Sequence, residues 1–322
     1  MILDVFILTV EQFAALLIFF GMGLLLGRCK ILPENTGTSL AQLLLYIFMP
    51  AMSFLGFAQQ FTLTKLSSYL LILTGSMVLM LISLVIGALT LRYFPGNETE
   101  KLTASYSMIF SNFGYLGYPL VLASYGQEML SKFMMFGLPF TILAYVYILP
   151  QWMPRGNKQG IRELLKRVFN PMMIAILLGL IWGALGIPMP SLLKNVCQMA
   201  SNCVSPCAMI ITGLAISRVS LKQAFYEKHV LAISTTRLLL LPALFTLATF
   251  WISRLTGLNS TLLLIVGAFT AMPLGMNPVI FSETYGRDGT LGAECTCVSL
   301  LVGLLTLPLM FELQNWLATL LG

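Results

Sequence analysis

The sequence predicts an all-α membrane protein of ten transmembrane helices, arranged as two inverted five-helix repeats in which the fourth and ninth helices are broken. Three observations support this fold class. The 322 residues are 58% hydrophobic and only 9% charged. Apolar runs of about 20 residues, the length that spans a bilayer, recur along the whole chain. Two of these runs carry clusters of helix-breaking residues at corresponding positions of the two halves.

The apolar runs are separated by hydrophilic connections that leave no room for a soluble domain. We expect the spans at residues 6–28, 38–57, 67–92, 103–125, 132–152, 171–188, 192–216, 229–253, 260–284 and 290–313. The first span is expected to be retained, because the chain starts MILD and lacks the cationic region and cleavage site of a secretory signal.

The net charge of +6 does not indicate a nucleic-acid partner, because the basic residues lie between the apolar runs instead of forming one stripe. The longest hydrophilic connection, residues 154–170, is strongly basic. If it is cytoplasmic, thirteen basic residues lie on its side of the membrane and four on the other, namely Lys65, Lys132, Lys194 and Arg254. The positive-inside rule then predicts that both termini are extracytoplasmic.

Three landmarks recur between the halves at nearly one offset. Gly23 matches Gly179, Pro50 matches Pro206 and Pro119 matches Pro278, at offsets of 156, 156 and 159 residues. Glycine and proline are frequent in membrane helices, so a single match has little weight, but a shared offset indicates a duplication of five spans. Because five is odd, the second copy enters from the opposite side. This predicts repeats at 1–153 and 171–322, joined by the basic loop 154–170.

The fourth and ninth runs contain SNFGYLGYP at 111–119 and AMPLGMNP at 271–278. An interior proline costs a helix about 3 kcal/mol, and glycine is also unfavourable. In hydrocarbon the freed backbone groups are tolerated only where protein or a wet cavity satisfies them. A pair of broken spans at corresponding positions is the best sequence indication of a transporter's substrate site.

The breaks also indicate the charge of the ligand. A new half-helix N-terminus exposes unpaired N–H groups and about half a positive charge, which favours an anion. The amides of Asn112 and Asn277 could donate to a carboxylate. Alternatively, either side chain could cap its own helix.

The segment 271–285, with P-x-G-M-x-P-x-I-F-S-E-x-Y after Ala271-Met272, resembles the auxin efflux carrier family. The stretch from Asn112 to Gly126 and the later LTLP at 305–308 are similar to the same family. The resemblance covers essentially the whole chain and implies that helices four and nine cross at their prolines. It also implies a substrate among the organic anions, such as auxin in plants or dicarboxylates in bacteria. The short central loop resembles a prokaryotic carrier, which implies the inner (plasma) membrane.

The resemblance supports Asn112 as a substrate-site residue more strongly than Asn277. Two polar residues elsewhere, Ser53 and Tyr145, are further candidates for lining the site, although each could bond within its own helix. The full set of candidate site residues is Asn112, Gly114, Gly117, Pro119, Pro273, Asn277, Pro278, Ser53 and Tyr145. We expect no cofactor, and coupling to a proton, to Na⁺ or to neither stays open.

Four ionisable residues in or near the spans are candidates for coupling, because such groups are costly in a membrane. Glu283 and Glu294 flank a cytoplasmic turn, which favours interfacial solvation, and Glu11 is placed near the outer interface. Arg237 lies about two turns into the eighth span, from where a long side chain can reach the interface. We therefore expect Arg237 to extend toward the membrane surface.

Other function classes find less support. The sequence has one histidine, no H-E-x-x-H and no G-x-S-x-G, so an enzyme is not predicted. Its cysteines are read as small packing residues. The alternatives within membrane transport are a sodium-coupled or sodium/proton exchanger-like carrier, which would use paired aspartates at the breaks, and an ion channel. The expected partners are a small organic anion and the lipid bilayer, and a homodimer is compatible with the resemblance.

Overall fold

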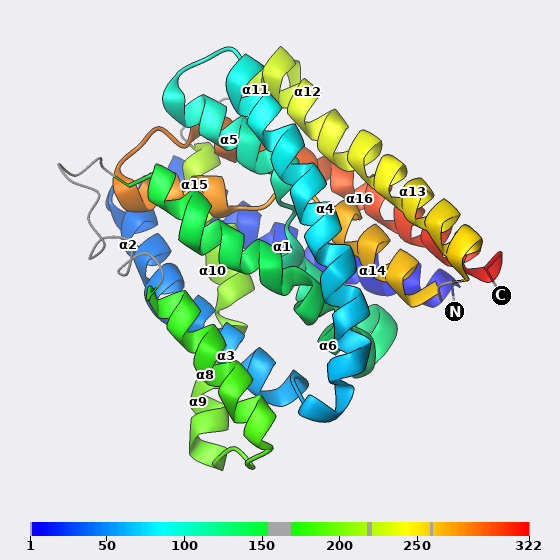
Figure 1. The fold of residues 1–322 in the computed structure, drawn as a ribbon. Coiled ribbons are helices and arrows are strands. Elements are labelled where there is room, and N and C mark those ends of the chain that lie inside the picture. Colours follow the sequence, from blue (N-terminus) through cyan, green and yellow to red (C-terminus); the bar gives the residue numbers. More distant parts are fainter. Residues whose placement is uncertain (1, 154–168, 218–220, 258–259, 322) are drawn as a thin grey trace.

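The computed structural model describes residues 2–153, 169–217, 221–257 and 260–321. Within these ranges the regular elements are all helices (Figure 1). The first half contains α1 (Ile2–Arg28), α2 (Thr36–Leu43), α3 (Met49–Gln60), α4 (Leu66–Tyr93), α5 (Glu98–Ile109) and α6 (Tyr118–Leu143). The second half contains α8 (Pro171–Leu185), α9 (Ser191–Asn202), α10 (Val204–Ser217), α11 (Leu221–Tyr226), α12 (Lys228–Thr235), α13 (Leu241–Thr256), α14 (Ser260–Ala271), α15 (Asn277–Tyr285) and α16 (Thr290–Thr319).

Short π-helical turns lie inside or at the ends of several of these helices. They are η1 (Leu44–Phe48), η3 (Phe113–Gly117), η4 (Ala144–Ile148) and η6 (Thr236–Leu240). Two 3-10 turns, η2 (Leu63–Lys65) and η5 (Leu149–Gln151), complete the elements. Such π turns are rare and often lie at functional sites. Here η3 lies within the predicted break of the fourth span, residues 111–119.

Six described helical stretches are long and apolar enough to cross a bilayer. They are Thr36–Gln60, Leu66–Tyr93, Ser124–Gln151, Ser191–Ser217, Lys228–Thr256 and Thr290–Thr319. The shorter apolar helices are Ala14–Arg28, Phe113–Leu122, Pro171–Leu185 and Ser260–Ala271. Each stretch overlaps one of the predicted spans, while their grouping into inverted repeats stays a prediction.

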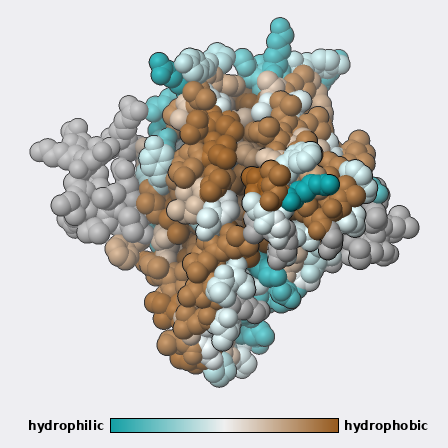
Figure 2. All heavy atoms as spheres, turned by 45° about the vertical axis from the view of Figure 1, so that its right-hand side comes forward, coloured by the Kyte–Doolittle hydropathy of each residue, from teal (hydrophilic) through white to brown (hydrophobic). Residues whose placement is uncertain are grey.

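The outer surface is apolar, as a bilayer requires. Large hydrophobic side chains of α4, among them Leu70, Val78, Leu81 and Val85, are more than half exposed. Hydrophobic residues cover much of the face shown in Figure 2. In water such a surface would be unstable, whereas lipid tails solvate it. The exposed leucines and valines are therefore consistent with helices that face lipid.

Two helix pairs pack with their backbones in very close contact. In the pair of α1 and α10, a Cβ atom on Gly23 would collide with the backbone of Ile210, and one on Gly213 with that of Phe20. In the pair of α3 and α8, which lie side by side in Figure 1, a Cβ atom on Gly179 would come within 2.7 Å of the carbonyl oxygen of Phe54. Small residues permit this approach. The glycines that reveal the sequence repeat thus serve equivalent packing roles in the two halves.

The N-terminus of α5 is fixed by a capping box. The side chain of Asn97 accepts a hydrogen bond from the backbone N–H of Glu100 at 2.9 Å, and the Glu100 carboxylate accepts one from the N–H of Asn97 at 2.9 Å. We expect Asn97→Ala to lower the free energy of unfolding by about 1 kcal/mol. Asn97→Ser retains an acceptor and should lose less. If thermal unfolding of the detergent-solubilised proteins shows the same loss of stability in both variants, the capping role is contradicted.

Candidate functional site

The candidate site is formed where two interrupted helices meet. The chain leaves helical geometry at residues 110–112, between α5 and η3, and at 272–276, between α14 and α15. These segments, called the paired breaks below, contact each other directly. The backbone N–H of Asn112 donates to the carbonyl oxygen of Pro273 at 2.9 Å. Ser111 and Leu274 form an isolated antiparallel β-bridge.

Neighbouring groups satisfy the backbone atoms that the second break frees. Proline has no N–H, so Pro273 cannot donate to the carbonyl of Phe269 four residues earlier. The Ser111 hydroxyl donates to that oxygen instead, at 2.6 Å. Nη2 of Arg237 donates to the carbonyl oxygen of Thr270 at 3.2 Å. These contacts explain how non-helical backbone is tolerated at membrane depth.

Ser111 offers a test of this arrangement. We expect Ser111→Ala to lower the free energy of unfolding by about 1 to 3 kcal/mol, because the Phe269 carbonyl would lose its donor in a buried position. Ser107→Ala is the matched control. The buried hydroxyl of Ser107 donates to Thr103 within the same helix, where the carbonyl is already part of the helical hydrogen-bond ladder. If the unfolding temperature falls equally in both variants, the bond from Ser111 to the Phe269 carbonyl contributes no more than an ordinary bond within a helix.

Asn112 is buried without any side-chain partner. Its side chain is 1% exposed, and neither Oδ1 nor Nδ2 has a hydrogen bond in the structure. The alternative that this amide caps its own helix is wrong, because only the backbone oxygen of Asn112 accepts bonds from Leu116 and Gly117. Most buried amides are hydrogen-bonded, so an orphaned amide requires an explanation. A ligand that binds beside it would supply the missing partner.

Asn277 plays a different part. It is 8% exposed, its Oδ1 accepts from the Tyr115 hydroxyl at 2.7 Å, and its Nδ2 donates to the Tyr106 hydroxyl at 2.7 Å. The capping alternative is therefore wrong for Asn277 as well. Tyr106 belongs to α5 and Tyr115 to η3, so Asn277 ties its helix to both sides of the first break. Sequence reasoning missed the two tyrosines, although a tyrosine in an apolar run usually needs a polar partner.

The other predicted residues surround this centre to differing degrees. Gly114 has open space where a side chain would be, whereas a Cβ atom on Gly117 would lie 3.1 Å from the ring of Phe133. Pro278 occupies the first turn of α15. The side chain of Pro119, near the start of α6, lies outside the described side chains.

Ser53 and Tyr145 are the two predicted site residues outside the broken spans. Ser53 is buried on α3. The Tyr145 hydroxyl contacts Sδ of Met49 at 3.5 Å, and the Tyr115 hydroxyl lies 3.1 Å from the same sulfur. Tyr145 and Tyr115 of the first break therefore share Met49 as a neighbour.

A cavity of about 520 Å³ reaches the first break from the ends of α3 and α9. Gly114 and Tyr118 line its inner part, and Ser205, whose hydroxyl donates to the Tyr115 carbonyl at 2.6 Å, lines another side. Its polar lining is rich in amides: Gln59, Gln60, Gln127, Gln198 and Asn202. No lining residue is charged. Amide N–H groups can donate hydrogen bonds to an anion even where no cationic side chain is present to form an ion pair.

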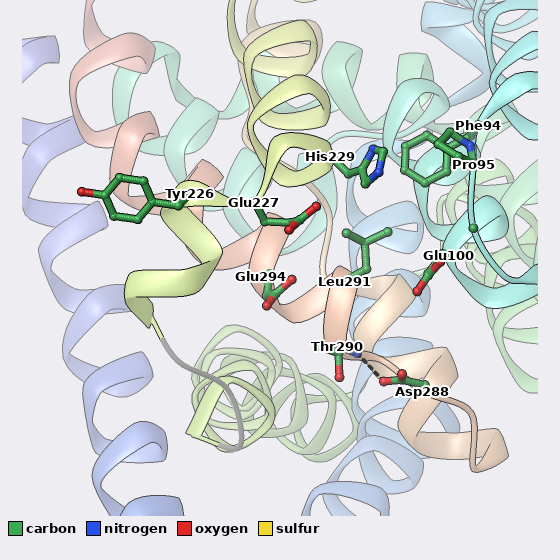
Figure 3. Close-up of a pocket in the computed structure, with 11 residues that line it drawn as sticks. Phe94, Pro95, Glu100, Tyr226, Glu227, His229, Asp288, Thr290, Leu291 and Glu294 are labelled. Carbon is green, nitrogen blue, oxygen red and sulfur yellow. Dashed lines mark hydrogen bonds between the residues drawn. The ribbon is translucent and has the colours of Figure 1, made fainter.

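A second cavity, of about 570 Å³, has the opposite character (Figure 3). Its lining contains His229 and four carboxylates, those of Glu100, Glu227, Asp288 and Glu294. In the described part of the chain no group of three or more His, Cys, Asp or Glu side chains is arranged to hold a metal ion. Several acidic groups disfavour an anion. Glu294 thus belongs to an acidic cavity near the start of α16, and it does not line the cavity that reaches the first break.

The remaining ionisable candidates also have defined places. Glu11 is exposed, and Glu283 accepts a hydrogen bond from the Thr38 hydroxyl at 3.3 Å. The expectation for Arg237 is wrong. Its side chain does not reach the membrane surface but is 2% exposed and bonded to α14 at the second break. The cause is local packing, because η6 lies against α14 and α16.

Comparisons with known proteins agree with a membrane transporter. The family model described as "Membrane transport protein" matches residues 8–163 and 158–311. The chain is 24% identical to an uncharacterized transporter of Methanothermobacter thermautotrophicus over 95% of this chain and 98% of that protein. It is 26% identical to an uncharacterized transporter of Methanocaldococcus jannaschii over 87% of this chain and 90% of that protein.

Proposed function

Since the chain belongs to the membrane transport protein family, that of the auxin efflux carriers, we propose that it is a secondary active carrier of small organic anions. The proposed mechanism is alternating access, by efflux or exchange, in the inner membrane. The substrate is a carboxylate that binds at the paired breaks. The family supports transport in general, and the chemistry of the breaks supports the choice of anion.

The observation that carries the proposal is the orphaned amide of Asn112. It precedes η3, so it lies at the N-terminus of a half-helix, where backbone N–H groups and the helix dipole favour negative charge. Asn277 starts the second half-helix, α15, in the same way. A carboxylate beside Asn112 would accept a hydrogen bond from the unpartnered Nδ2. The open space at Gly114 and the amide-lined cavity beyond it supply a route for a small ligand.

We further propose that the two halves are inverted repeats whose fourth and ninth helices cross at the paired breaks. The matched packing of α1 on α10 and of α8 on α3 supports this arrangement. These four helices would form a scaffold. The bundle that contains the paired breaks would move against it. With both termini extracytoplasmic, the amide-lined cavity opens outward, so the structure would correspond to an outward-facing state.

The sodium-exchanger alternative finds no support in the buried charges. A Na⁺ or proton exchange site of that kind needs carboxylates, and in the described residues no aspartate or glutamate is fully buried. Cation coupling through such a site is therefore not part of the proposal. The channel alternative differs in kinetics, since a channel would show neither saturation at low substrate nor countertransport.

The proposal is tested with purified protein in proteoliposomes. Uptake of labelled monocarboxylates and dicarboxylates is measured with and without unlabelled substrate inside, and with and without imposed proton and Na⁺ gradients. We expect saturable uptake of at least one of these carboxylates. Unsaturable conductance would favour a channel, and a strict requirement for a Na⁺ gradient would favour the exchanger-like alternative.

A further inference from the structure

Arg237 is the one charged residue whose side chain is fully buried within the described part of the chain. It lies in η6, and its single hydrogen bond is from Nη2 to the carbonyl oxygen of Thr270. Its Nε is buried and has no partner. Among the described residues no carboxylate lies within ion-pair distance of Arg237. The bundle therefore holds a positive charge without an opposite one.

Such a charge is costly. A guanidinium has five N–H donors, and the desolvation of an ion inside a protein costs several kcal/mol unless it is paired. The acceptor at Thr270 lies at the end of α14, where the helix dipole contributes about half a negative charge. That compensation is partial. The remaining positive charge would be neutralised by an anion held in the same bundle.

The paired breaks, where the proposed substrate binds, lie near Arg237 in space. Thr270 precedes Pro273 by three residues, and the carbonyl of Pro273 is bonded to Asn112. Tyr106, which accepts from Asn277, is within electrostatic range of Arg237. In addition, η6 packs against α5 and α14, the helices that lead into the two breaks, and against α16. Arg237 thus belongs to the same rigid surroundings as the orphaned amide of Asn112.

We propose that Arg237 is the fixed counter-charge of the transported anion, and that it makes the carrier an exchanger. This inference rests on the proposed function. When the site closes from water on both sides, a bound anion leaves the bundle neutral, whereas an empty site leaves the cation unpaired in a dry interior. Each 1.4 kcal/mol of that difference slows the return of the empty carrier tenfold. The loaded carrier changes state readily, and the empty one does not.

The test compares exchange with net transport. In proteoliposomes, uptake of a labelled carboxylate is measured with and without the same anion inside, for the wild type, Arg237→Gln and Arg237→Lys. Glutamine keeps an amide donor without a charge, so this variant removes the charge with a small loss of polarity, and lysine keeps both charge and donor. Arg92→Gln, at an exposed position at the end of α4, is the control.

We expect internal anion to accelerate wild-type uptake by about tenfold or more, because an unpaired buried ion is strongly disfavoured. In Arg237→Gln the ratio of exchange to net uptake should fall toward one and the KM should rise, whereas Arg237→Lys should keep a high ratio. The control should match the wild type. A folded Arg237→Gln variant with the wild-type ratio and KM would overturn the inference.

The wild type alone also decides the matter if Arg237→Gln does not fold. Saturable anion transport with a ratio near one would overturn the exchanger inference and leave the proposed function intact. A wild type that transports none of the carboxylates would overturn the proposed function, and the inference with it. A ratio well above one supports both.

Discussion

Asn112→Ala is expected to raise the KM for the transported carboxylate about 10- to 100-fold while leaving the thermal stability of the protein unchanged or slightly higher. A hydrogen bond to a charged group contributes about 1.5 to 3 kcal/mol, which corresponds to that change in affinity. The stability prediction follows from the free protein. The Asn112 amide is buried with no partner, so removing it relieves a desolvation cost of about 1 to 3 kcal/mol.

The matched control is Asn277→Ala. Asn277 is a similarly buried asparagine at the other break, but its amide bonds to Tyr106 and Tyr115. Its removal leaves two buried hydroxyls without this partner, and we expect thermal unfolding at a clearly lower temperature. The measurements are uptake kinetics in proteoliposomes and unfolding in detergent without substrate. If Asn112→Ala were destabilised as strongly as Asn277→Ala, its amide would be structural and the substrate assignment would be wrong.

The positions of the breaks could be predicted from sequence because their cause is local. Pro273 cannot complete a helical hydrogen bond wherever it lies, and the cluster around Asn112 is equally unfavourable to helix. The role of each asparagine could not be predicted, because it depends on partners far away in the chain. Asn277 bonds to Tyr106 and Tyr115 from the other half, whereas the side chain of Asn112 has no hydrogen-bond partner.

Arg237 shows a second limit of sequence reasoning. Along a regular helix, its depth of about two turns allows the side chain to reach the membrane surface. In the structure Arg237 lies in the π turn η6, where five-residue hydrogen bonding changes the direction in which side chains project. The Thr270 carbonyl can accept the hydrogen bond of Arg237 because α14 ends at Ala271 and leaves this oxygen without a helical donor. Both causes are tertiary, so the sequence alone favoured the wrong interpretation.

Gly23→Val is expected to lower the free energy of unfolding by about 3 kcal/mol and to reduce the yield of monodisperse protein. A Cβ atom on Gly23 would collide with the backbone of Ile210 in α10. A side-chain neighbour could change rotamer, but a helix backbone can yield only by moving the whole helix, and overpacking typically costs 1 to 3 kcal/mol. In a membrane this cost is not offset elsewhere, since helix association depends on close packing instead of on burial from water.

The control for this prediction lies on the same helix. Gly21 is two residues earlier in α1, and no atom would lie within 4 Å of a Cβ atom there. Gly21→Val therefore introduces the same side chain with the same helix propensity but without the collision. We expect it to purify and unfold like the wild type, as followed by size-exclusion chromatography and thermal unfolding. Equal behaviour of the two variants would show that α1 and α10 can separate without loss of stability, and the scaffold on which the proposed bundle moves would then not be rigid at this contact.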